Sequence, residues 1–171
     1  MNHKMTSKKA LNIATVRGIG FSLMVAAFLI IGQPLRSYMW CSYVGFTLCV
    51  AVGGISVKRL PNALCSCAIG FFWAAVYMGA PGLINGMIGG NVDVYIVLVE
   101  LVTTFCILYT HLYLLQNTPF NMVPFLFGSV ACTFGKGSLS DIPLCFVAIA
   151  IGILTAFITG IVIDKTAPKE Q

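Results

Sequence analysis

The chain has 171 residues, of which 58% are hydrophobic and 9% are charged, and its formal net charge is +5 at pH 7. A soluble domain carries about a quarter charged residues, so this chain has too few charges to cover a surface that faces water. At roughly 20 residues per membrane span, its length accommodates about six spans and little else. These properties exclude a soluble protein and predict one integral membrane domain over residues 1–171.

Six apolar segments follow one another along the chain, and we predict that each forms a transmembrane helix. They cover residues 14–32, 38–55, 62–78, 92–115, 122–134 and 142–163. Residues 79–90 are rich in glycine and proline and predict a loop at the membrane interface. The fifth segment is short, since at about 1.5 Å per residue it reaches roughly 20 Å, against about 30 Å for the hydrocarbon core. The predicted fold class is an all-α membrane protein with six transmembrane helices.

Basic residues flank the apolar segments, and their distribution predicts the topology. With the N-terminus in the cytoplasm, the cytoplasmic side holds Lys4, Lys8, Lys9, Arg17, Lys58, Arg59, Lys165 and Lys169. The opposite side holds only Arg36 and Lys136. This asymmetry follows the positive-inside rule and places both termini in the cytoplasm. It also accounts for the net positive charge without a nucleic-acid partner; the expected surroundings are a lipid bilayer.

Two stretches of the sequence, 83 residues apart, resemble each other. The identical pairs at this offset are Met39 and Met122, Gly45 and Gly128, Cys49 and Cys132, and Gly54 and Gly137. We therefore predict two three-helix repeats, at about 14–78 and 92–163. An odd number of crossings inverts the second repeat relative to the first, as in many transporters and channels. The alternative is chance similarity between apolar helices.

The ends of the two repeated stretches contain the first group of candidate pathway residues. These are Gly53 and Gly54 in the first copy, and Gly135, Lys136 and Gly137 in the second. Glycine-interrupted segments at matching places in two halves indicate a substrate site, where backbone groups are exposed to solute. The alternatives are an ordinary glycine cap at each helix end and, for Lys136, a lysine whose amine extends to the interface.

A polar stripe in the fourth segment provides the second group of candidates. At helical spacing, one face presents Glu100, Thr103, Thr104 and His111. A charged residue inside the membrane costs about 2.5 to 3.5 kcal/mol even on the insertion scale, so Glu100 is expected to face protein or water. The stripe is interpreted either as a polar route that holds a proton or cation, or as a static hydrogen-bond network with Glu100 protonated.

No catalytic constellation is recognisable, and neither a metal site nor a cofactor is predicted. The seven cysteines, Cys41, Cys49, Cys65, Cys67, Cys106, Cys132 and Cys145, lack metal-ligand spacing and are expected to pack as small apolar residues. Small residues at four-residue spacing occur on three segments and allow close helix contact, within one chain or in a homo-oligomer. We therefore do not expect an enzyme.

The repeated stretches also resemble a known family. The similarity rests on Trp40, Gly45-Phe46-Thr47, Gly53-Gly54, Trp73, Val123-Pro124, Gly128 and the run Ala131-Cys132-Thr133-Phe134-Gly135-Lys136-Gly137. These residues resemble the bacterial inner-membrane proteins of the YcdZ type, grouped as domain of unknown function 1097. Val52 is a departure, since a member of that family has a more polar residue before its paired glycines. The resemblance implies a multi-pass protein of the bacterial inner membrane and brings no established activity or site.

Two functions are compatible with these sequence features. The inverted halves, the short paired segments and the polar stripe favour a channel or secondary transporter for a small neutral or weakly acidic solute, whose identity the sequence leaves unknown. The alternative is an accessory subunit that packs against a larger membrane complex and has no transport activity of its own.

Overall fold

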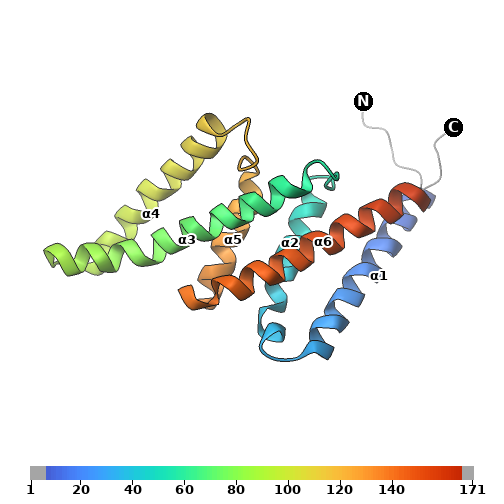
Figure 1. The fold of residues 1–171 in the computed structure, drawn as a ribbon, viewed down its shortest axis with the longest axis horizontal. Coiled ribbons are helices and arrows are strands. Elements are labelled where there is room, and N and C mark those ends of the chain that lie inside the picture. Colours follow the sequence, from blue (N-terminus) through green and yellow to red (C-terminus); the bar gives the residue numbers. More distant parts are fainter. Residues whose placement is uncertain (1–6, 167–171) are drawn as a thin grey trace. The chain divides into compact units, whose positions relative to one another are not determined.

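A computed structural model describes residues 7–166 of the chain, and within them the regular structure is entirely helical (Figure 1). The six α-helices are α1 (Ser7–Ile31), α2 (Met39–Ala51), α3 (Leu60–Ile88), α4 (Val92–Tyr109), α5 (Val123–Lys136) and α6 (Ile142–Thr166). Short 3-10 turns precede α2 and α6, and a π-helical turn, Thr110–Leu114, continues α4. Lys4 and Lys169, which contribute to the predicted charge asymmetry, lie outside the described residues.

Within residues 7–166, four helices are long and apolar enough to cross a membrane. They cover Lys8–Ile31, Leu60–Ile88, Val92–Leu114 and Leu139–Thr166. The other two are short: α2 has 13 residues and α5 has 14. The short fifth helix is thereby confirmed. The expected span over 38–55 is longer than the helix found there, because α2 ends before Gly53 and Gly54, whose φ angles are +81° and +96°.

The loop predicted for residues 79–90 is wrong, because α3 continues through this segment for a total of 29 residues. Pro81 lies inside the helix and is buried. Proline removes one backbone hydrogen bond, but in an apolar medium an unwound segment would leave many more backbone groups without partners. The chain turns only at Gly89 and Gly90, both with positive φ. The glycine and proline residues of this segment therefore lie inside a long apolar helix. Both residue types are more frequent in membrane helices than in soluble ones.

The helices group into two compact units. Residues 1–56 and 148–171 form the first, which contains α1, α2 and most of α6; residues 57–147 form the second, which contains α3, α4 and α5. In the first unit, α6 contacts α2 closely, because Gly152 meets the backbone of Ser42. The end of α6 meets the beginning of α1, where the Asn12 amide donates a hydrogen bond of 3.1 Å to the Thr166 hydroxyl.

In the second unit, α3 is the central helix and packs against both α4 and α5. Gly70 of α3 meets the backbone of Leu126 in α5, and the Cys67 thiol lies 3.7 Å from the Phe125 carbonyl oxygen. One buried cluster in the core of this unit contains Ala74, Tyr77, Ile107, Leu126 and Val130. Small residues on α3 thus allow two helix backbones to approach, as is common for helices that pack in lipid.

The offset seen in the sequence also relates the helix boundaries. The first span ends at Ile31 and the span that begins with α4 ends at Leu114, and these two residues are 83 residues apart. The helices α3 and α6 begin at Leu60 and Ile142, which are 82 residues apart. Gly70 and Gly152, which make the close backbone contacts in the two units, are also 82 residues apart.

The close contact at Gly70 predicts a stability effect. A Cβ atom there would overlap the backbone of Leu126, which cannot move as a flexible side chain could, so Gly70→Ala should destabilise the second unit by about 1–3 kcal/mol. Thermal unfolding of the detergent-solubilised protein measures the effect. The matched control is Gly79→Ala on the same helix, where nothing lies within 4 Å of the new methyl group. Equal stabilities of the two variants would contradict the contact.

The first unit offers an equivalent experiment. Gly152→Ala should lower the midpoint of unfolding because its Cβ would overlap the backbone of Ser42, whereas Gly160→Ala on the same helix enters open space. An unchanged midpoint for Gly152→Ala, measured in the same assay, would show that α2 and α6 do not approach as described.

Candidate functional site

The helix α4 contains the polar stripe expected from the sequence, and its start is fixed by local hydrogen bonds. The Asn91 side chain accepts a hydrogen bond from the Asp93 backbone amide at 2.9 Å and caps the helix. The Tyr95 hydroxyl donates to the Gly89 carbonyl oxygen at 2.6 Å, across the turn from α3. These bonds determine where the helix begins and therefore which side chains share a face.

The stripe is divided between two faces of α4. The buried face contains Val99, Thr103, Ile107 and His111, spaced four residues apart. Glu100 is exposed and lies outside this buried row. Thr104 is half-buried and lies between the two sets. The structure thus brings Thr103 and His111 to one side of the helix and leaves Glu100 apart from them.

His111 links three parts of the second unit. The indole Nε1–H of Trp73, on α3, donates a hydrogen bond of 3.1 Å to Nε2 of His111. The other ring nitrogen, Nδ1, lies 2.7 Å from the carbonyl oxygen of Phe120, just before α5. Because an indole N–H only donates and a carbonyl oxygen only accepts, the ring must be neutral with its proton on Nδ1. His111 therefore holds α4 to α3 and to the segment that leads into α5.

Thr104 makes a second bond between α4 and α3. Its hydroxyl lies 2.6 Å from the hydroxyl of Tyr77, whose side chain is buried in the core of the unit. Thr104 and His111, two polar side chains of the stripe, are thus both engaged in hydrogen bonds with α3. Both contacts correspond to the static hydrogen-bond network that is the alternative interpretation of the stripe.

Glu100 lies at the edge of an open hollow on the outer side of α4. The hollow has a volume of about 400 Å³ and is lined by Val97, Glu100, Leu101, Thr104, Phe105 and Leu108. Its apolar walls are highly exposed, with Leu101 at 65% and Phe105 at 67%. The carboxylate is therefore surrounded by side chains that suit lipid or another protein surface, and not water.

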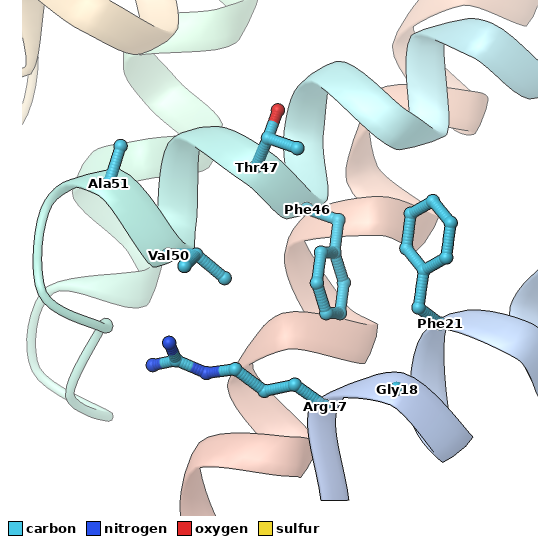
Figure 2. A pocket seen from close by; sticks show the side chains of 7 residues that line it. All are labelled: Arg17, Gly18, Phe21, Phe46, Thr47, Val50 and Ala51. Carbon is cyan, nitrogen blue, oxygen red and sulfur yellow. The ribbon is translucent and has the colours of Figure 1, made fainter. Parts of the chain in front are cut away.

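Arg17 occupies a similar position in the first unit, although it is absent from the candidate residues predicted from the sequence. Figure 2 shows its side chain in a hollow of about 440 Å³ between α1 and α2, lined by Arg17, Gly18, Phe21, Phe46, Thr47, Val50 and Ala51. The charge distribution groups Arg17 with the basic residues that flank the first span. However, α1 begins at Ser7, so the arginine lies nearly three turns inside the helix. The signal that could have found it is the repeat offset, because Arg17 and Glu100 are 83 residues apart.

The candidate glycines lie at helix ends, in different units. In the first unit, the Gly54 amide donates a hydrogen bond to the Cys49 carbonyl oxygen at 2.8 Å. The Gly53 amide donates to the Val50 carbonyl oxygen at 3.1 Å. In the second unit, the amide of Gly137 donates to the Thr133 carbonyl oxygen at 2.9 Å, and this glycine has a left-handed backbone. These amides complete ordinary helix caps.

Gly135 and Lys136 lie in the last turn of α5. The predicted pathway residues are therefore distributed among two helix ends and two sides of α4. Within residues 7–166 there is no group of three or more His, Cys, Asp or Glu side chains that could hold a metal ion, and none of the seven cysteines forms a disulfide.

Long apolar helices, a large exposed apolar surface and polar contacts between helices define a multi-pass membrane protein. A family model matches residues 17–167, so the chain belongs to the family described as protein of unknown function (DUF1097). The resemblance noted in the sequence is thereby confirmed over most of the chain. No curated protein and no solved structure matches the chain.

The two bonds of His111 predict a stability role for this side chain. His111→Phe should destabilise the protein by about 1–3 kcal/mol, because the Trp73 indole and the Phe120 carbonyl would lose their buried partner. Unfolding by denaturing detergent in mixed micelles measures the effect. The control is Tyr113→Phe on the same turn, where the side chain is 61% exposed. If His111→Phe is no less stable than the control, the link between the helices is wrong.

Proposed function

We propose that this protein is a channel or secondary transporter for a small neutral or weakly acidic solute, built from two inverted three-helix repeats, and that it is not an enzyme. The observation that carries the proposal is that the two compact units have similar internal contacts at the offset of the sequence repeat. Short helices ending in glycine at matching positions of two halves are typical of substrate pathways.

The two short helices support this duplication. The helices α2 and α5 have similar lengths, and each is followed by a glycine with positive φ. These are Gly54, with φ of +96°, and Gly137, with φ of +75°, which are 83 residues apart. Each short helix packs against a long helix that brings a glycine to its backbone, Gly152 for α2 and Gly70 for α5.

The first helix of each repeat also contacts the third helix of the other repeat. Gly20 of α1 meets Thr159 of α6, and Thr104 of α4 meets Tyr77 of α3. Tyr77 and Thr159 are 82 residues apart, the same offset as the two glycines. In both units, the first two helices of one repeat thus pack against the third helix of the other.

The positions of the helix ends support an even number of crossings. The hydrogen bond between Asn12 and Thr166 brings the start of α1 to the end of α6. In a membrane, both ends then lie on one side, which is the cytoplasmic side by the distribution of basic residues. We propose the bacterial inner membrane, with six crossings that include the short helices α2 and α5.

A specific observation favours the alternative of an accessory subunit. His111 and Thr104, two members of the proposed polar route, are engaged in bonds between helices. The outer side of α4 is apolar and exposed over much of its length, as expected for a surface that meets another protein. The assignment of a pathway to the α4 stripe and to the glycine-bearing helix ends remains a prediction.

A flux measurement distinguishes the two functions. Purified protein in liposomes should raise the rate of solute entry above that of protein-free liposomes for at least one small neutral solute or weak acid. Light scattering reports neutral solutes such as urea and glycerol, and an internal pH dye reports weak acids such as acetate. No acceleration across the panel, together with a stoichiometric membrane partner in pull-downs, would favour the accessory subunit.

The topology gives an independent prediction. A fluorescent protein fused after Gln171 should fold and fluoresce in bacteria, because the C-terminus is expected in the cytoplasm, whereas alkaline phosphatase at the same site should be inactive. The control is a fusion truncated after Met122, in the turn that follows α4. After four crossings this fusion should also be cytoplasmic, and a fusion after Gly90, following three, should report the opposite side. An active phosphatase after Gln171 would contradict an even number of crossings.

A further inference from the structure

We infer that α1 of one copy packs against the outer side of α4 of a second copy, where Arg17 of the first copy pairs with Glu100 of the second. This pairing defines an interaction surface and its partner, and it does not depend on transport. In residues 7–166, these are the only Asp, Glu, Lys or Arg side chains more than two helical turns from the ends of their helix. Charged groups in such positions face a protein interior or pair with one another.

Each of the two side chains lies in an open, largely apolar hollow. The Arg17 hollow is formed by α1 and α2, and Figure 2 shows the guanidinium extending along it toward Val50. The Glu100 hollow is formed by α4 alone. Among residues 7–166, neither side chain forms an ion pair within its own unit. A carboxylate and a guanidinium are therefore both presented on outward surfaces that require cover in a bilayer.

The two groups lie at matching depths. Arg17 is two residues before the middle of α1, and Glu100 is three residues before the middle of the span Val92–Leu114. At about 1.5 Å per residue, each Cα atom lies within about 5 Å of the middle of its helix. The long side chains of arginine and glutamate can bridge this difference whether the two helices run parallel or antiparallel. Shape also fits, because Gly18 beside Arg17 leaves space for an approaching helix.

The chemistry of the two surfaces favours a second copy as the occupant. They occupy equivalent positions at the repeat offset and carry opposite charges, so one chain presents both halves of a complementary contact. A contact between two different surfaces of identical chains is heterologous, and it produces a closed ring if the rotation between copies closes. The planar guanidinium can form two hydrogen bonds with the carboxylate, which gives such a contact a defined register.

Cross-linking between differently tagged copies tests the pairing. Arg17→Cys in one tagged chain and Glu100→Cys in a chain with a different tag are co-expressed, with Cys65 and Cys106 replaced by alanine, and membranes are treated with a mild oxidant. We expect a disulfide-linked product that contains both tags. As the matched control, Ile30→Cys replaces Arg17→Cys. Ile30 is exposed on the same helix but lies about 20 Å farther along it, and should give no such product.

A charge-reversal series keeps the test decisive if a cysteine variant does not fold. The wild-type protein should be an oligomer in nanodiscs or mild detergent by light scattering, and Arg17→Glu or Glu100→Arg alone should shift it toward monomer. The double variant should restore the oligomer, because the pair is reversed and not removed. The inference is overturned if the wild type is monomeric, if the double variant is no better than the single ones, or if the cysteine pair gives no more doubly tagged product than the Ile30→Cys control.

Discussion

In each unit a glycine on a long helix brings its backbone against that of a short helix, and the packing of the unit depends on this close contact. Lipid solvates apolar side chains as well as a protein interior does, so helices in a membrane are held by close packing and by buried hydrogen bonds. Gly70 lets α3 reach the backbone of α5, and Gly152 lets α6 reach the backbone of α2. The two short helices end near Gly54 and Gly137, which are 83 residues apart and both have positive φ.

The polar side chains of α4 have two different roles. Thr104 and His111 hold the helix to α3, and the bonds of His111 to Trp73 and to the Phe120 carbonyl require one neutral form of the ring. Glu100 faces outward among apolar side chains, in a position equivalent to that of Arg17 in the first unit. Polar residues within one span therefore serve the internal packing of a unit on one side and, in our inference, the association of copies on the other.

Much of the fold follows from the sequence, because hydropathy and segment length determine where a chain can cross a membrane. The all-helical class and the short fifth helix are predicted in this way, whereas the family follows from the resemblance of particular residues, among them the run from Ala131 to Gly137. The continuation of α3 through Pro81 is not, because the turn signals of soluble proteins are overridden where unpaired backbone groups are costly. Residue spacing also places Glu100 and His111 on one stripe. A stripe is broad, however, and only the contacts with α3 show which of its residues face inward. Charge distribution places Arg17 at the membrane edge, whereas α1 already extends over the ten residues before it, from Ser7.

Duplication of a three-helix unit and its inversion across the membrane would explain the paired contacts of the two units. An experimental structure in a lipid nanodisc, in which α1, α2 and α3 are superposed on α4, α5 and α6, would test this origin. We expect the two sets to superpose through a two-fold rotation about an axis in the membrane plane, with Gly70 falling on Gly152 and Arg17 on Glu100. Helices that do not superpose, or a rotation about the membrane normal, would show that the halves are not inverted copies.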